Sequence, residues 1–186
     1  MNNGLLVVNK PKGMTSRDVV NKVCRKFNTK SVGHIGTLDP LAEGVLVCLI
    51  GKYTKLANIL TNHDKEYIAS FKLGILTDTL DITGNVLKED KKDFNQNKII
   101  NALNHYKGSY NQEVPIYSAV KVNGKKLYEY ARNNIDVKLP SKIVNIYDIE
   151  LIDIKDDIIT IKCKVSKGTY IRSLIRDIGA FLDTYA

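Results

Sequence analysis

The sequence is poor in the features that hold metal ions. Its three cysteines, Cys24, Cys48 and Cys163, are far apart, and no Cys-x-x-Cys or Cys/His spacing links them. A structural zinc site is therefore not expected. Each cysteine stands in an apolar pattern and is interpreted as a small core residue. An odd, scattered set of thiols is typical of a reducing compartment, so we expect a cytoplasmic protein.

Long apolar runs are also absent. Runs such as Val45–Ile50 are far shorter than the roughly 20 residues that a membrane-spanning helix needs. The N-terminal residues carry no signal-peptide core, and no low-complexity segment, fixed-period repeat or Gly/Ser linker occurs. With 186 residues and 44% hydrophobic content, the chain fits one globular domain over residues 1–186, or one domain with an appended lobe.

Charge of one sign is in excess. The formal net charge is +8 and the isoelectric point about 9.3. Two basic regions can attract a polyanion, most often nucleic acid, by neutralising its phosphates. The alternative is an ordinary lysine-rich surface. The regions are Lys10, Lys12, Arg17, Lys22, Arg25, Lys26 and Lys30, with only Asp18 opposing them, and Lys121, Lys125, Lys126, Arg132, Lys138 and Lys142.

Hydrophobic periodicity predicts both strands and helices. Strands are predicted at 4–9, 45–50, 65–73, 116–122, 142–155 and 158–165, with 45–50 forming a buried run. Helices are predicted after a Thr15 or Ser16 cap, over 53–60, after an Asp93 cap, over 125–132 and from Ile171 to Leu182. Because no regular βαβ repeat occurs, we expect an α+β fold with a mixed, mainly antiparallel sheet flanked by helices.

One carboxylate stands in a loop rich in glycine. The segment Gly33–Gly44 reads GHIGTLDPLAEG and contains Asp39, which is followed by Pro40. Glycines allow close backbone approaches, and the proline pushes Asp39 toward extended geometry. With no metal-ligand or cofactor motif nearby, the loop favours nucleophilic or acid–base chemistry on a bound substrate. An Asp before Pro is otherwise most often a turn residue.

Six blocks of the chain resemble one family. The segments 4–16, 33–46, 65–67, 77–84, 117–125 and 166–174 are similar, in this order, to blocks of the bacterial tRNA pseudouridine-55 synthases of the TruB type. The resemblance covers nearly the whole chain, and the block that contains Asp39 is the most specific. It implies the pseudouridine synthase catalytic fold.

The resemblance also implies a reaction. A uridine in the T-loop of tRNA, at position 55, is isomerised to pseudouridine: the N1–C1′ bond breaks, the uracil turns, and C5 bonds to C1′. The family uses no cofactor and no metal. The partner is the T-arm of tRNA, no membrane is involved, and we expect a monomer. The target uridine must be flipped out of its stack before a side chain can reach it.

Asp39 and Arg172 are the charged residues that the resemblance assigns to the active site. Asp39 matches the catalytic aspartate, for which attack on the sugar and proton abstraction from it both stay open. Arg172 matches an arginine that pairs with this aspartate, and a guanidinium within about 4–6 Å keeps a carboxylate ionised. From its pattern alone, Arg172 is a solvated arginine on a helix.

Three further residues match substrate-binding positions of the family. Tyr67 corresponds to a tyrosine that stacks on the flipped uracil, and Tyr170 to one that lines the pocket. His34 corresponds to a histidine that contacts RNA. Core packing is the alternative for Tyr67, and a hydrogen bond to backbone is the alternative for His34. Asp78 and Asp81 are interpreted as turn and capping residues rather than metal ligands.

The resemblance also assigns segments of the chain. Residues 110–141 match an RNA-gripping insertion that carries the second basic region. Family members normally continue beyond the last residues of this chain, often into a small C-terminal RNA-binding module. Because the amphipathic pattern of 171–182 still runs where the chain stops, the sequence is interpreted as a catalytic core incomplete at its C-terminus.

Two alternative functions stay open. The first is a non-catalytic tRNA-binding or RNA-folding protein that uses the same pocket. A carboxylate aimed at an RNA sugar argues against pure binding, because it repels phosphate. The second is a related synthase that acts on another RNA, such as a guided complex or a ribosomal target.

Overall fold

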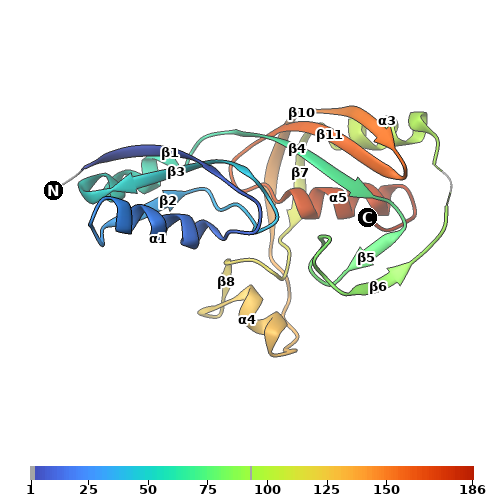
Figure 1. Ribbon diagram of the computed structural model, residues 1–186. Helices are drawn as coiled ribbons and strands as arrows, with labels where there is room; N and C mark the ends of the chain where they lie inside the picture. Colours follow the sequence, from blue (N-terminus) through green and yellow to red (C-terminus); the bar gives the residue numbers. More distant parts are fainter. Residues whose placement is uncertain (1–2, 93) are drawn as a thin grey trace. The chain divides into compact units, whose positions relative to one another are not determined.

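The computed structural model describes residues 3–92 and 94–186 (Figure 1). By its internal contacts the chain divides into two compact units, unit 1 (Met1–His63) and unit 2 (Asp64–Ala186). Each unit has its own hydrophobic core, so each is described by itself.

Unit 1 contains a three-stranded antiparallel sheet in the order β1-β3-β2. The strands are β1 (Gly4–Lys10), β2 (Val32–Ile35) and β3 (Gly44–Ile50). A 3₁₀ helix, η1 (Gly51–Leu56), and a single α-helical turn, α2 (Ala57–Leu60), follow β3. The sheet thus places the Asp39 segment between its edge strand β2 and its central strand β3.

Helix α1 (Ser16–Lys26) closes the core of unit 1. Thr15 is its N-cap, and Thr15 and Asp18 form a reciprocal capping box. The helix buries its valine face against β3, because apolar side chains recur at helical spacing. The buried residues of this core are Val19, Val23, Leu46, Cys48 and Ile50.

Unit 2 contains a four-stranded antiparallel sheet in the order β4-β11-β10-β7. Its strands are β4 (Lys65–Lys72), β7 (Gly108–Glu113), β10 (Ser141–Lys155) and β11 (Ile158–Val165). The long strand β10 pairs with β7 over its first part and with β11 over its remainder. One face is apolar and the other largely exposed, as period-2 alternation requires.

Two helices cover the apolar face, α3 (Gln96–His105) and α5 (Ile171–Phe181). Figure 1 shows α5 running along the sheet. Both helices contribute to one core, whose buried residues are Phe71, Ile99, Ala102, Leu103, Ile146, Ile149, Ile159, Ile161, Cys163, Val165, Leu174 and Ile178. The α+β class with antiparallel sheets flanked by helices is confirmed.

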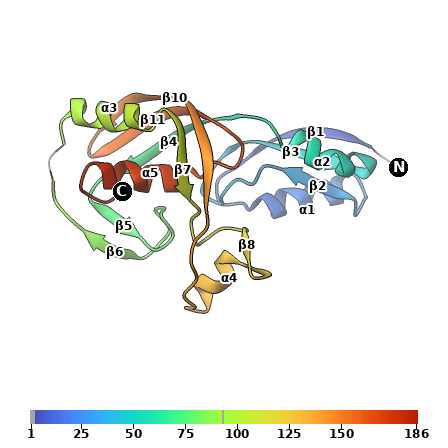
Figure 2. The ribbon, with the colours of Figure 1, turned by 180° about the vertical axis from the view of Figure 1, so that it is seen from behind.

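Two hairpins complete unit 2. The first joins β5 (Ile75–Thr77) to β6 (Val86–Glu89). The second joins β8 (Lys121–Val122) to β9 (Lys125–Lys126) and continues into α4 (Leu127–Arg132). Asn123 and Gly124 both have positive φ, which suits a two-residue hairpin turn. Figure 2 shows β8 and α4 lying away from the four-stranded sheet.

Several predicted elements need correction. The strand over 116–122 is wrong except for Lys121–Val122, because the backbone of 116–120 bonds locally or to the β9–α4 segment. The basic helix begins at Leu127, because Lys125 and Lys126 are in β9. The residues of the short helix predicted over 53–60 are helical, but they divide between the 3₁₀ helix η1 and the α-helical turn α2. Val45 is 71% exposed, because it points to the outer face of β3, so the run is not buried throughout.

The start of α3 and the end of α5 differ from the prediction. Asp93 lies outside the described residues, and the N-cap of α3 is Asn95, which accepts from the Lys98 amide. Helix α5 ends at Phe181 rather than continuing. Asp183 has a φ of 56°, and the Thr184 amide donates to Gly179 O at 3.0 Å, which is a left-handed helix terminus. The amphipathic pattern therefore stops before the last residues.

The cysteines have the environments expected of core residues in two cases. Cys48 and Cys163 are buried, whereas Cys24 is only partly so. Burial raises the pKa of the Cys163 thiol to about 11, which keeps it protonated and unreactive. Over the part of the chain that the structure describes, no helix is long and apolar enough to span a membrane.

Candidate functional site

The Asp39 loop of unit 1 is tied down from both of its sides. It leaves β2 through Gly36, whose φ is 75°, and enters β3 at Gly44, whose φ of 123° favours glycine. The Ser16 hydroxyl donates to Leu38 O at 3.1 Å and accepts from the Leu38 amide at 3.0 Å. Ser16 is buried at the start of α1, so the helix fixes the residue that precedes Asp39.

Lys10 anchors the other side of the same loop. Its ammonium is fully buried and donates to Met14 O at 2.7 Å, Pro11 O at 3.0 Å and Pro40 O at 3.4 Å. Burial lowers the pKa of Lys10, and the negative charges of Asp39 and Glu43 oppose that shift. Lys10 is therefore a buried residue that links backbone carbonyls. It does not belong to the first basic region, where the sequence had placed it.

His34 stands on β2, opposite Cys48 of β3. Its Nδ1 atom lies 2.9 Å from Gly36 O, so in the tautomer with a proton on Nδ1 the ring donates to the backbone of the same loop. This matches the reading of a histidine bonded to backbone. The ring is only partly buried, and its contact with RNA remains a prediction.

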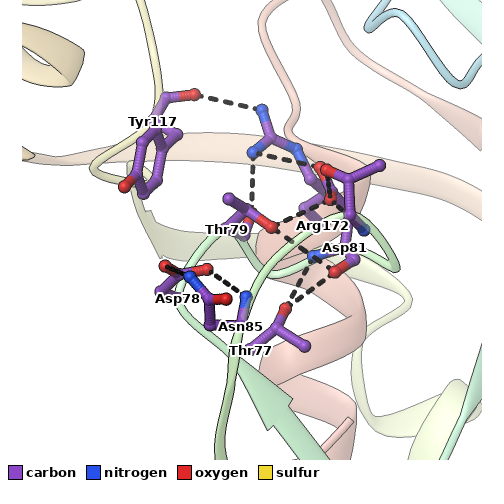
Figure 3. A network of polar contacts seen from close by, with 8 residues as sticks. Thr77, Asp78, Thr79, Asp81, Asn85, Tyr117 and Arg172 are labelled. Atoms are coloured by element: carbon purple, nitrogen blue, oxygen red, sulfur yellow. Dashed lines mark hydrogen bonds and ion pairs between the residues drawn. The ribbon is translucent and has the colours of Figure 1, made fainter. Parts of the chain in front are cut away.

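In unit 2, the turn between β5 and β6 is organised by two aspartates (Figure 3). Asp78 accepts from the backbone and side-chain amides of Asn85 at 2.9 and 3.3 Å. Asp81 accepts from the Thr83 amide at 2.9 Å and the Thr83 hydroxyl at 2.6 Å. A Cβ on Gly84 would overlap the polar atoms of this turn. Both aspartates are turn residues, as the sequence indicates.

Arg172 reaches from α5 into this turn. Its guanidinium donates to Thr79 O at 2.8 Å and to Tyr117 O at 3.1 Å, and lies 3.9 Å from Asp81 Oδ2 (Figure 3). Its side chain is 15% exposed, so the reading of a solvated helix arginine is wrong. Arg172 joins three segments, namely α5, the β5–β6 turn and the loop before β8.

The protonation of Asp81 is set by its neighbours. Burial opposes ionisation, but the hydrogen bonds from Thr83 and Thr79 and the charge of Arg172 outweigh it and lower the pKa of Asp81. The carboxylate therefore stays ionised and keeps its attraction for Arg172. This network holds the guanidinium of Arg172 in a fixed orientation.

Tyr170 is the N-cap residue of α5 and is held by Gln112 of β7. The Gln112 side chain accepts from the Tyr170 amide at 2.8 Å and donates to its carbonyl at 3.1 Å. The Lys142 ammonium lies 4.3 Å from the centroid of the Tyr170 ring. One side of the ring is thus next to a cation, and the ring is partly buried.

Tyr67 lies on β4, opposite Cys163 of β11. It is partly buried and packs against the core of unit 2 on the same face as Ala69 and Phe71. The core-packing interpretation therefore describes part of its surface, while its stacking on a base remains a prediction.

The segment 110–141 presents cations around an aromatic ring. Lys126 Nζ lies 5.3 Å and Arg132 Cζ 5.2 Å from the centroid of Tyr128. Lys121, Lys125, Arg132 and Lys138 are exposed. Exposed cations beside aromatic rings suit the backbone and bases of single-stranded RNA.

The predicted site residues thus fall into two sets. Asp39 and His34 belong to unit 1, whereas Tyr67, Tyr170 and Arg172 belong to unit 2. The pairing of Asp39 with Arg172 stays a prediction. Sequence reasoning missed Lys10, Ser16 and Gln112 as anchors. For Lys10 a signal existed, since it follows Leu6 and Val8 on the inner face of β1. For Gln112, no pattern in the sequence indicates its role as an anchor.

Comparison with known proteins identifies the family of this chain. Residues 24–171 match the TruB family pseudouridylate synthase (N terminal domain). A tRNA pseudouridine synthase B of Caldicellulosiruptor saccharolyticus is 51% identical over 184 residues, covering 99% of this chain and 64% of the relative. One of Fusobacterium nucleatum is 48% identical over 183 residues, covering 98% and 64%. The chain thus spans less than two-thirds of the length of these relatives.

Chains in two solved structures are similar in fold to this chain. A Cbf5-Nop10-Gar1 complex contains a chain that is 30% identical, with a TM-score of 0.75, matched over 98% of this chain and 45% of that chain. An H/ACA RNP bound to a substrate RNA containing 2'-deoxyuridine contains one that is 27% identical, with a TM-score of 0.70, over 98% and 44%. On the sequence match over residues 24–171 and the identity to these relatives, the chain belongs to the TruB family of pseudouridylate synthases.

Proposed function

We propose that this protein isomerises uridine to pseudouridine in the T-loop of tRNA, at position 55. The observation that carries the proposal is the identity of 48–51%, over nearly the whole chain, to tRNA pseudouridine synthases B. Within the structure, the tied Asp39 loop supports it, because a catalytic carboxylate must be held in place by its surroundings.

In the proposed reaction, Asp39 acts on the flipped uridine. The N1–C1′ bond breaks, the uracil turns, and C5 bonds to C1′ while the hydrogen on C5 leaves as a proton and N1 gains one. Lys10 keeps a positive charge near Asp39 and ties Pro40 in place. Attack of Asp39 on the sugar and abstraction of a proton from the sugar are the two routes to cleavage of this bond.

The residues of unit 2 bind and position the nucleotide in this proposal. Tyr67 stacks on the uracil, and stacking on an aromatic ring contributes about 1–3 kcal/mol per base, which offsets part of the unstacking energy. Tyr170 lines the pocket, and Arg172 pairs with Asp39. The cations beside Tyr128, Lys126 and Arg132, contact the RNA backbone.

The test uses a tRNA transcript that carries tritium at C5 of uracil. Formation of the C5–C1′ bond must release that tritium, so the count reports the isomerisation itself. We expect release with the parent chain and none with Asp39→Asn, while the variant still binds tRNA. Asp156→Asn is the matched control, because it removes one exposed carboxylate from the β10–β11 turn and should leave release unchanged.

Two outcomes point elsewhere. Binding without tritium release by the parent chain would indicate the non-catalytic RNA-binding alternative. Release that ribosomal fragments suppress more strongly than tRNA or a T-arm stem-loop would indicate a synthase for another RNA. That competition is a useful test because a solved H/ACA RNP contains a chain that is 27% identical to this one.

A further inference from the structure

The four-stranded sheet of unit 2 ends in a rigid turn. After β11, the Ser166 amide donates to Asn145 O at 2.8 Å, and Ser166 Oγ accepts from the Asn145 amide at 2.9 Å. The Thr169 hydroxyl donates to Ser166 O at 2.9 Å. The turn 166–169 is therefore fixed to β10 just before α5 begins. A ligand that binds over this turn contacts a hydrogen-bonded backbone.

Lys142 of β10 reaches over this turn. A Cβ on Gly168 would lie 3.1 Å from Lys142 Nζ, and the φ of Gly168 is +78°, so glycine both allows the turn and leaves room for the ammonium. The same Nζ lies 4.3 Å from the Tyr170 ring centroid. Lys142 is partly buried, because its side chain points to the same face of β10 as Val144 and Ile146.

The Lys142 charge is left uncompensated by protein anions. Among residues 3–92 and 94–186, Lys142 forms no salt bridge and no hydrogen bond within the usual distances, and the Tyr170 ring is its one charge-stabilising contact. Burial lowers the pKa of Lys142, and no carboxylate counters that shift. A partly buried ammonium without an anion is unfavourable, and an anion from outside would relieve it.

Two more lysines stand at the same end of the sheet. Lys65 on β4 pairs in register with Val165, the last residue of β11, and Lys167 is in the turn. Burial lowers the pKa of Lys65; the nearby charge of Asp64 opposes the shift and that of Lys167 adds to it. Lys65 shares the face of β4 that carries Tyr67, because side chains alternate along a strand.

We propose that Lys142, together with Lys65 and Lys167, binds one phosphodiester group of the RNA beside Tyr170. This inference rests on the proposed function, since it takes Tyr170 as part of the uridine pocket. Ammonium groups bind phosphate as point charges and release counterions on doing so. A phosphate held there lies next to the nucleotide whose uracil turns, so it would fix the sugar of that nucleotide against Tyr170.

The competing role for Lys142 is internal: it holds the Tyr170 ring by a cation–π contact and touches no RNA. The two roles differ in one respect that can be measured. An internal role affects binding of every RNA equally, whereas a phosphate contact depends on the charge of one particular phosphate.

The experiment measures binding of the 186-residue chain to a T-arm stem-loop at several salt concentrations. Lys142→Met should weaken binding about tenfold, the loss expected for one charged contact. It should also reduce the slope of log affinity against log salt by about 0.7–0.9. Lys142→Arg should restore most of both. Lys164→Met is the control, because Lys164 lies on β11 but on the opposite, exposed face.

The decisive comparison uses stem-loops in which one phosphate at a time is a neutral methylphosphonate. In one of these RNAs the neutral group replaces the phosphate that Lys142 binds, near the target uridine. For that RNA, the parent and Lys142→Met should have equal affinity. Equal weakening by Lys142→Met with every RNA, or no weakening at all, would overturn the proposal. Thermal unfolding checks that the variant is folded, and Lys65→Met, with a smaller loss and the same phosphate dependence, is the second variant.

Failure of this inference is distinct from failure of the proposed function. The binding series does not depend on turnover, whereas tritium release does. If the parent releases tritium and Lys142→Met loses the same affinity for every RNA, the proposed phosphate site is wrong and the proposed synthase function stands. If Lys142→Met loses affinity in a phosphate-specific way but the parent releases no tritium, the phosphate site stands and the protein binds RNA without catalysis.

Discussion

Gln112 holds the backbone of Tyr170 at both of its polar groups. The side-chain carbonyl of Gln112 accepts from the Tyr170 amide at 2.8 Å, and its amide donates to the Tyr170 carbonyl at 3.1 Å. Gln112 is fully buried on β7, and Tyr170 is where α5 begins. A helix that lacks a side-chain cap at its own N-terminus is thus fixed by a neighbouring strand.

Gln112→Leu should therefore destabilise the protein by about 1–3 kcal/mol, because it removes the buried acceptor of the Tyr170 amide, whereas the Tyr170 carbonyl still accepts from the Leu174 amide at 3.0 Å. Urea unfolding measures the change. Asn111→Leu, on the same strand but exposed on the opposite face, should alter stability by less than about 0.5 kcal/mol. Equal urea midpoints for Gln112→Leu and Asn111→Leu would show that the hydrogen bonds between Gln112 and Tyr170 contribute nothing to stability.

Arg172→Met should lower both stability and activity. It removes the donors to Thr79 O and Tyr117 O and leaves Asp81, whose side chain is 14% exposed, without its cation. We expect a loss of about 2–4 kcal/mol by urea unfolding and a fall in tritium release that persists where the variant is fully folded. Lys164→Met, which removes an exposed cation on β11, should lose less. A normal rate of tritium release with Arg172→Met would contradict the role proposed for the guanidinium.

Asp81 gives the stability of the protein a dependence on pH. Its pKa is lowered in the folded state, so its stabilising contribution is fully present above the unfolded value of about 3.9. That contribution is lost as the pH falls through the folded pKa. The difference in unfolding free energy between parent and Asp81→Asn should thus be constant near neutral pH and shrink below about pH 4. A difference that is flat down to pH 2 would rule out the lowered pKa.

Lys10→Met should loosen the Asp39 loop. Methionine can fill much of the space of the lysine stem, but it removes the ammonium donor to the carbonyls of Met14 and Pro11, while the Pro40 carbonyl keeps the Gly13 amide as a donor. We expect a loss of about 1–3 kcal/mol and reduced tritium release. Lys12→Met, two residues away and exposed, should match the parent in both. If the two variants behave alike, Lys10 does not position the loop.

Much of the fold follows from local patterns. The alternation in 65–72 and 158–165 predicts β4 and β11, and the spacing of apolar residues from Val19 to Val23 predicts α1 behind its Thr15 cap. These predictions hold because amphipathic periodicity depends only on near neighbours. The strand predicted at 116–122 failed because its polar backbone groups find other partners, which no local pattern reveals.

What the sequence determined by itself was the class of fold, the family resemblance and the identity of the chemical groups. The resemblance to one family identifies Asp39, Tyr67, Tyr170 and Arg172 as candidates, because the blocks that contain them occur in the order of that family. The tertiary structure decided which of the charges are buried and what each one contacts. Lys10 and Lys142 are lysines counted in basic regions, yet one ties three carbonyls inside unit 1 and the other stands over a tyrosine ring. Burial and hydrogen bonding depend on residues distant in sequence, so only the folded chain shows them.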